Sequence, residues 1–374
     1  MPAKHMEVRP NVSVQHPTTV APSQRIHWID IAKGIGIILV SFGHIRNGDG
    51  QSVWLPALDT PINIIYLFHM PLFFFLGGLT FSSRRQFPDF LKVKAKTLLI
   101  PYYIFSLYFI AKPIAVLLIP SLGASMQANH DYSNIGLQLY DVLINGSGLW
   151  FLWAYFIGEL VAYPLDRWFT TKYQYLVSGF LLIAVSILFG KCLPGVTLPF
   201  QIVSGVEVAG FILLGIACKQ TQTLQTFTNR SLIWALFIIV LAAFRTIAFP
   251  ALSFSTKPWG VLISALAMFL GVAAGVLLSM AIMKNAVLEY IGRHSLSFYV
   301  VNAITLNIGK IVFFKLLHID GTQANIAMQW VYGILLTIFC LGLLALEDII
   351  IRALIPWSLG IKRQKRLQKE TDAI

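Results

Sequence analysis

A succession of long apolar runs is the feature that most constrains the fold of this chain. Each run approaches 20 residues, the length that an α-helix needs to cross a bilayer, and the runs recur from residue 28 to residue 351. Only 12% of the residues are charged, whereas soluble domains carry about 25%. A water-soluble core cannot bury so many runs, and we therefore predict an all-α, polytopic integral membrane protein.

The chain length allows about ten transmembrane helices joined by short loops. We expect these spans at residues 28–45, 61–82, 97–119, 149–165, 174–190, 199–218, 231–249, 259–283, 295–315 and 327–351. Residues 1–24 are polar and lack an apolar run, which predicts a disordered cytoplasmic tail rather than a signal peptide. Residues 25–352 are then one transmembrane domain, and residues 353–374 are a basic cytoplasmic tail.

The distribution of basic residues predicts the orientation in the membrane. A net charge of +12 would by itself suit a nucleic-acid partner. With the N-terminus in the cytoplasm, however, the outward loops hold only Arg46, Lys191 and Lys257, and most of the 28 lysines and arginines lie in inward segments and tails. This positive-inside bias is typical of membrane proteins. It predicts both termini in the cytoplasm and no nucleic-acid partner. We expect the protein in the inner (plasma) membrane of a bacterium.

Two further features limit the possibilities. The three cysteines, Cys192, Cys218 and Cys340, are scattered, so neither a disulfide framework nor a cysteine-rich metal site follows. The outward segment 120–148 is long and polar, and we expect it to cover the outer mouth of a cavity.

The first span, DIAKGIGIILVSFGH, carries three ionisable residues. Lys33 and His44 are eleven residues apart. At helical spacing this is about three turns, which places them on nearly the same face roughly 16 Å apart. Asp30 precedes Lys33 by one turn. Charged groups are costly in hydrocarbon, so this face is expected to meet protein or water. Lys33 could instead snorkel to the inner headgroups, and His44 is either an inert interfacial histidine or a general base.

The second span, PINIIYLFHMPLFFFLGGLTF, carries His69 in its outer half. Pro71 removes a backbone hydrogen bond and should kink the helix, and Gly77 and Gly78 allow another helix to approach closely. His69 is either hydrogen-bonded to a neighbouring helix or shares a site with His44. A metal site built on the two histidines lacks an obvious third ligand, so we expect no metal.

The inner loop after this span, SSRRQFPDFLKVKAKTLLIPYY, is strongly basic. Its cations either follow the positive-inside rule and bind anionic lipid, or they bind the phosphates of a cytosolic, nucleotide-like donor. The residues concerned are Arg84, Arg85, Lys92, Lys94 and Lys96.

Later spans add further polar candidates. Trp150 opens the fourth span, where an interfacial aromatic belt is the simpler explanation. Glu159 and Glu207 lie inside spans and should be neutral or paired, and Asn302 lies near mid-membrane in the ninth span. Candidate partners for the two carboxylates are Lys33, Lys112 and Arg245.

Several of these segments together resemble the membrane-bound acyltransferase type 3 family. The run from Asp30 to His44 is similar to the first-span signature of the family, with Lys33 where arginine is more usual. FHMPLFFFLGG is similar to the second-span motif of the sugar O-acetyltransferase branch, which includes fucose 4-O-acetylase-like proteins. KVKAKTLLIPYY, GLWFL and GRHSLSFYVVN resemble later blocks, with Asn302 where histidine is common. The likeness covers roughly residues 26 to 351.

The resemblance implies an enzyme that transfers an acetyl group from acetyl-CoA to a sugar hydroxyl of a surface polysaccharide or its lipid-linked precursor. It implies His44 and His69 as catalytic residues and the basic loop with Lys33 as the CoA-binding residues. We assign acceptor binding to Asp30, Trp150, Glu159 and Asn302. Acetyl-CoA is then a substrate, and no tightly bound cofactor is expected.

Two other classes of function remain open on the sequence. A glycolipid or polysaccharide transporter or flippase could line its path with the same ionisable face, although such a protein predicts an internal repeat, and the sequence shows none. A non-enzymatic membrane scaffold would leave two intramembrane histidines and a lysine without a role.

Overall fold

The computed structural model describes residues 26–46, 54–118, 135–222, 224, 227–253 and 259–361. Over these ranges there is no β-strand, and nine helical segments are long and apolar enough to cross a membrane. The predicted all-α, polytopic membrane fold is confirmed. The α-helices are α1 (His27–Gly43), α2 (Asp59–Tyr66), α3 (His69–Thr80), α4 (Phe87–Lys94), α5 (Ile100–Leu118), α7 (Ile135–Tyr140), α8 (Trp150–Trp168), α9 (Lys172–Cys192), α10 (Ile202–Thr221), α12 (Arg230–Ser253), α13 (Gly260–Ile282), α14 (Ala286–Arg293), α15 (Ser295–Lys310) and α16 (Ile326–Leu354).

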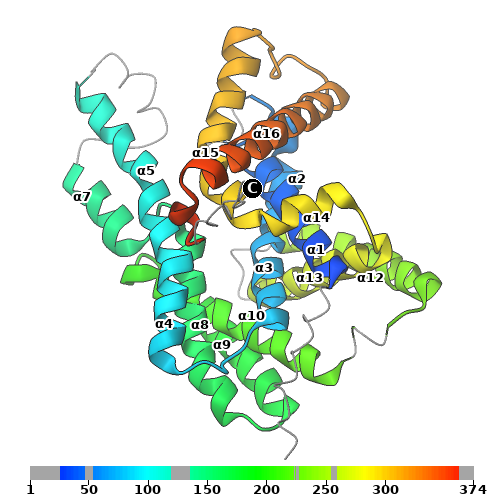
Figure 1. Cartoon of the computed structure of the whole chain (residues 1–374). Coiled ribbons are helices and arrows are strands. Elements are labelled where there is room, and N and C mark those ends of the chain that lie inside the picture. Colours follow the sequence, from blue (N-terminus) through cyan, green and yellow to red (C-terminus); the bar gives the residue numbers. More distant parts are fainter. Residues whose placement is uncertain are drawn as a thin grey trace, which may run out of the picture.

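Helix α1 accounts for the difference between about ten predicted spans and the nine segments found. It has 17 residues, fewer than any of the nine. Helices α3, α13, α14, α15 and α16 all pack against it, and Figure 1 shows it in the interior of their group. Its polar residues therefore face protein: Asp30 is buried and Lys33 is half-buried.

The predicted second span is divided into two helices, α2 and α3. The break lies at Leu67 and Phe68, and the backbone of Phe68 is non-helical (φ −137°, ψ −17°). Pro71 explains the position of the break, because its nitrogen cannot donate to the Leu67 carbonyl and its ring clashes with that carbonyl in a continuous helix. The proline instead lies in the first turn of α3, where a missing N–H costs nothing. The predicted kink is thus a complete break just before His69.

Helix α3 connects two groups of helices. On one side it packs against α10, which also contacts α8 and α9, and on the other side it packs against α1 and α13. Figure 1 shows α3 between the α8–α9–α10 group and α1. Residues carried by α3 can therefore meet residues from both groups.

Two glycines bring α3 and α10 into backbone contact. A Cβ atom added to Gly78 would lie 2.2 Å from the Ile212 carbonyl oxygen, and one added to Gly215 would lie 2.4 Å from the Phe75 carbonyl oxygen. Both positions therefore require glycine, as is common where membrane helices cross closely. The predicted close approach at the Gly77–Gly78 pair is present.

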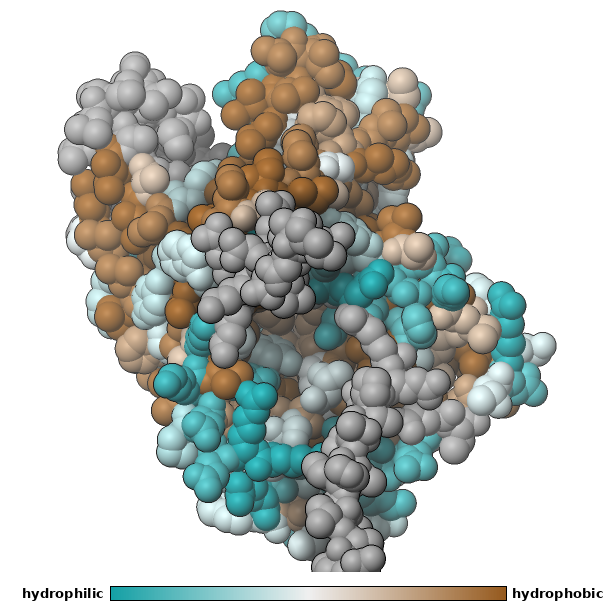
Figure 2. Space-filling view, viewed as in Figure 1, coloured by the Kyte–Doolittle hydropathy of each residue, from teal (hydrophilic) through white to brown (hydrophobic). Residues whose placement is uncertain are grey.

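The surface separates apolar arms from a polar region. Figure 2 shows hydrophobic residues covering the arm formed by α5 and the arm formed by α15 and α16, and hydrophilic residues gathered over α4 and the loop before it. Arg84, Arg85 and Lys92 in this hydrophilic region are exposed. We call the end of the bundle that holds them the basic end.

The packed part of the chain extends beyond residue 352, where we placed the end of the transmembrane domain. A 3₁₀ turn, Pro356–Leu359, follows α16, and Leu359 is buried in a cluster with Ile351. Gly360 has φ +70°, and a Cβ there would lie 2.6 Å from the Lys96 carbonyl oxygen. The turn at residues 356–360 is therefore packed against the main body, whereas the predicted N-terminal tail, residues 1–24, and residues 362–374 lie outside the described residues.

Candidate active site

A cavity of about 640 Å³ lies at the end of the bundle where α1 ends and α3 begins. Helices α1, α2, α3, α5, α8, α9, α10, α13 and α15 or their termini contribute to its lining. Among the polar and aromatic candidates named from the sequence, His44, His69, Trp150, Glu207 and Asn302 line it. The cavity therefore brings together side chains that are separated by up to 258 positions in the chain.

His44 is the residue at the C-terminal cap of α1. Its side chain is exposed and forms part of the cavity wall. Its Nδ1 lies 2.8 Å from the carbonyl oxygen of Val40. A carbonyl oxygen only accepts hydrogen bonds, so Nδ1 carries the proton and donates it, and Nε2 of the neutral ring keeps a free lone pair. The ring is thus fixed by the main chain in the tautomer that a general base requires at Nε2.

His69 is held in the same manner at the start of α3. Its side chain is buried, with 2% exposed, and its Nδ1–H donates to the carbonyl oxygen of Ile65 at 2.9 Å. The break before α3 leaves this carbonyl near the ring, since α2 ends at Tyr66. Neutral His69 therefore also has an unprotonated Nε2, which can accept a hydrogen bond from a ligand hydroxyl.

Tyr66 lies between the two histidines. Its ring centroid is 5.9 Å from that of His44 and 4.8 Å from that of His69, and its hydroxyl donates to the carbonyl oxygen of Gly43 at 3.3 Å. The Arg46 guanidinium lies over the Tyr66 ring, with its central carbon 3.9 Å from the ring centroid. Sequence reasoning missed both residues in this role, although Tyr66 lies one helical turn before His69.

Asn302 and Trp150 supply polar and aromatic surface to the cavity. The Asn302 Nδ2 group donates to the Ser41 hydroxyl at 2.7 Å, which ties α15 to α1. Its Oδ1 is buried and has no hydrogen-bond donor among the described residues. Trp150 is the first residue of α8. The lining also includes Lys191, Ser204 and Glu207.

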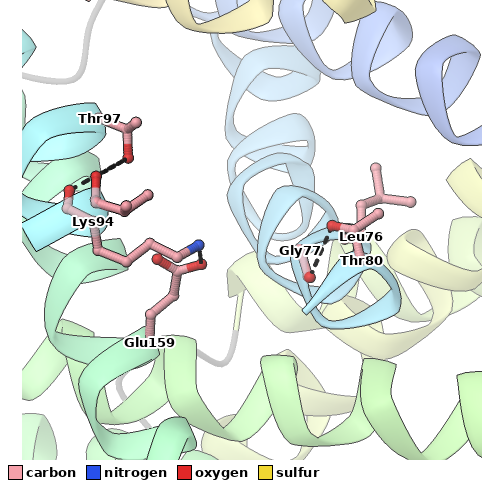
Figure 3. Close-up of polar contacts among 7 residues, drawn as sticks. Leu76, Gly77, Thr80, Lys94, Thr97 and Glu159 are labelled. Atoms are coloured by element: carbon pink, nitrogen blue, oxygen red, sulfur yellow. Dashed lines mark hydrogen bonds and ion pairs between the residues drawn. The ribbon is translucent and has the colours of Figure 1, made fainter. Parts of the chain in front are cut away.

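Glu159 lies away from the cavity lining, toward the basic end. Figure 3 shows Lys94 of α4 reaching the Glu159 carboxylate of α8, and the two form an ion pair in which the Glu159 side chain is almost fully buried. The partner that we expected for Glu159 was Lys33, Lys112 or Arg245, and this expectation was wrong. The remaining sequence candidates, Asp30, Lys33, Arg84, Arg85, Lys92 and Lys96, also do not line the cavity.

A second buried carboxylate, Asp348 of α16, binds three partners, one on its own helix and two at α14 and its C-terminal cap. The His294 ring and Asp348 form an ion pair, Arg352 Nε donates to Oδ1 at 2.6 Å, and the Tyr290 hydroxyl donates to Oδ2 at 3.0 Å. The Asp348 side chain is 1% exposed. This group joins α14, α15 and α16 and does not line the cavity.

The cavity offers groups suited to acid–base chemistry. Over the described ranges, no cluster of three or more His, Cys, Asp or Glu side chains could hold a metal ion. The cavity is of the size that binds small organic ligands, 300–1,000 Å³ as a rough guide. It offers two imidazole nitrogens with free lone pairs, and proton transfer from a hydroxyl is the chemistry for which these are suited.

Comparison with protein families identifies the chain. A family model described as an acyltransferase domain matches residues 26–345. Because the match covers most of the chain, the protein belongs to the acyltransferase 3 family and is a membrane acyltransferase. The resemblance found in the sequence is confirmed at this level. No curated protein and no solved structure gives a significant match.

Proposed function

We propose that this membrane acyltransferase moves an acetyl group from acetyl-CoA to a sugar hydroxyl of a surface polysaccharide or its lipid-linked precursor. We place it in the inner membrane of a bacterium with both termini in the cytoplasm. The observation that carries the proposal is the presence of His44 and His69 in one cavity, each with Nδ1 bound to a main-chain carbonyl and Nε2 open.

In the proposed reaction His44 is the general base. Its Nε2 accepts the proton of the acceptor hydroxyl while the hydroxyl oxygen attacks the thioester carbonyl carbon. The carbon–sulfur bond then breaks, and the departing CoA thiolate takes the proton from the His44 imidazolium. General-base assistance of this kind contributes about 10²–10⁴-fold to the rate.

His69 fits the role of binding the acceptor hydroxyl. Its Nδ1–H is committed to Ile65, so the neutral ring can accept, but not donate, a hydrogen bond at Nε2. This favours contact with a hydroxyl over stabilisation of an oxyanion, which needs a donor. A covalent acetyl-histidine intermediate on His44 is a variant of the same mechanism.

The donor would enter from the basic end. Arg84, Arg85 and Lys92 are exposed there and suit the phosphates of CoA, with Lys33, Lys94 and Lys96 nearer the bundle. Lys94 is already paired with Glu159, so its contribution to phosphate binding should be smaller. The rise along α1 from Lys33 to His44 is about 16 Å, a distance that the extended pantetheine arm can bridge.

The test compares His44→Ala with His318→Asn, a change to an exposed histidine that does not line the cavity. Membrane vesicles from a strain lacking the gene would carry each variant together with the native acceptor. Base-labile label transferred from radiolabelled acetyl-CoA to glycan is measured. We expect transfer by the wild type and by His318→Asn, and a loss of about 10²–10⁴-fold in His44→Ala. Undiminished transfer by His44→Ala would exclude both forms of the mechanism.

A further inference from the structure

Glu207 is an unusual residue in the cavity lining. It lies in the second turn of α10, within a segment able to span the membrane, and its side chain lines the cavity. It makes no hydrogen bond or ion pair with any residue that the structure describes. An ionisable side chain inside a membrane protein normally has a partner, and one without a protein partner at a cavity wall points to a ligand.

A second oxygen in the same lining also lacks a donor. Asn302 is 3% exposed, and although its Nδ2 is bound to Ser41, its Oδ1 has no partner among the described residues. Buried polar atoms are rarely left unsatisfied, and exceptions of this kind call for an explanation. Because the Asn302 Oδ1 atom is itself buried, the Glu207 carboxyl group on α10 is the acceptor of this pair that a ligand in the cavity can reach.

These features define the chemistry of a matching ligand. It must supply hydrogen-bond donors, and it must tolerate the aromatic surface of Trp150. The lining carries one basic side chain, Lys191, and one carboxyl group, Glu207, so its charge does not require a cationic ligand. A neutral molecule with several hydroxyl groups and an apolar ring face meets these conditions.

We propose that the Glu207 carboxylate accepts hydrogen bonds from acceptor hydroxyl groups that are not acylated, and so directs the reacting hydroxyl toward His44. The inference rests on the proposed function and adds a positioning residue that selects the acceptor. Two hydroxyls bound by one carboxylate fix the orientation of the ring, and orientation of this kind is a large part of catalysis between two substrates.

The experiment uses Glu207→Leu and Glu207→Gln in the same vesicle assay of label transfer. Loss of two hydrogen bonds to the acceptor predicts that Glu207→Leu lowers the transfer rate at limiting acceptor by about 10- to 100-fold. Glu207→Gln keeps one acceptor oxygen and should retain an intermediate rate. The KM for acetyl-CoA should be unchanged in both variants.

Arg245→Gln is the matched control. It also removes an ionisable side chain from a spanning helix, but Arg245 is exposed in a groove on α12 and does not line the cavity. Its transfer rate should equal that of the wild type. Thermal stability of the purified variants separates positioning from structure, because removing an unpartnered carboxylate from a membrane helix should leave the melting temperature unchanged or raise it.

The outcomes are distinguishable. The assignment of Glu207 alone is overturned if Glu207→Leu transfers label at a rate within twofold of the wild type. It is also overturned if a lowered melting temperature shows that the lost transfer comes from unfolded protein. Label that is absent in the wild type, or that survives in His44→Ala, overturns the proposed function and this inference with it.

Discussion

The cavity and the basic end treat their polar side chains differently. At the basic end, Lys94 is paired with Glu159 across two helices. In the cavity, His44 and His69 each use one ring nitrogen to bind the main chain and keep the other open, and Glu207 has no partner among the described residues.

The Asp348 group belongs with the paired type. Its carboxylate is bound by an imidazole, a guanidinium and a phenol. Breaking a buried pair is costly because the remaining group is left without compensation. We conclude that paired groups hold helices together, whereas groups whose hydrogen-bonding capacity is unused within the protein bind the ligands. Changes to paired groups should therefore affect stability, and changes to cavity groups should affect rate.

The largest expected effect is on stability, from Asp348→Asn. Removing this charge leaves Arg352 and His294 without their carboxylate, although their side chains keep 31% and 25% exposure. We expect a loss of about 3 kcal/mol in the free energy of unfolding, at the low end of the range for broken buried pairs. Denaturant titration in detergent measures it. Loss of transfer per folded molecule at unchanged stability would break the comparison.

The next effect is on rate, from His69→Asn. The asparagine amide can still donate to the Ile65 carbonyl from near the Nδ1 position, so stability should change little, while the Nε2 atom that accepts from the acceptor is lost. One such hydrogen bond is worth about 1.4 kcal/mol at the upper end, or roughly tenfold in the KM for acceptor. Steady-state kinetics at varied acceptor and fixed acetyl-CoA would show it. A large fall in the melting temperature would instead place His69 with the structural groups.

A smaller effect is expected from the double substitution Arg84→Gln and Arg85→Gln. Both side chains are exposed, so solvent screens their contacts with phosphate. The KM for acetyl-CoA should rise about two- to fivefold, with kcat and stability unchanged. The increase should shrink at high salt, since screening weakens the wild-type contact as well. A salt-independent change would argue against phosphate binding at this loop.

The smallest effect concerns His27 and Glu289, outside the spanning segments. The hydrogen bond from His27, at 3.0 Å, holds the pKa of the Glu289 carboxyl below its usual range. A carboxyl with a lowered folded-state pKa stabilises the protein fully above its unfolded-state pKa of about 4.3. This contribution is lost as the pH falls through the lower, folded-state value. His27→Ala removes this hydrogen bond and should therefore flatten the acid limb of a melting temperature profile below about pH 5, where the Glu289 carboxyl of the unfolded chain begins to take up a proton.

Much of the fold could be predicted from the sequence, because span length and charge distribution are local properties. The positions of the helices follow the apolar runs closely, and Pro71 revealed that the second span is not straight. The complete break at Leu67 and Phe68 was not predicted, since it depends on whether neighbouring helices favour a kink or a new helix start.

The site was predictable only in part. The alignment of ionisable residues on the first span led to His44, and the motif around Pro71 led to His69. The Lys94–Glu159 pair could not be read from the sequence, because its members are 65 positions apart and meet only through the packing of α4 on α8. Tyr66 and Arg46 were missed for a related reason, since their contact crosses the loop between α1 and α2.

The glycine contact between α3 and α10 has a consequence for the cavity, although it lies away from it. His69 and Glu207 lie in the N-terminal parts of α3 and α10, whereas Gly78 and Gly215 lie toward the C-terminal ends. The angle between the two helices at this contact therefore sets how far apart their N-terminal parts lie. One methyl group added at this contact would push α3 and α10 apart and change the width of the cavity at their other ends. The distance between His44 and the acceptor thus depends on a helix contact outside the cavity. Gly78→Ala should therefore slow transfer although it replaces no residue of the lining.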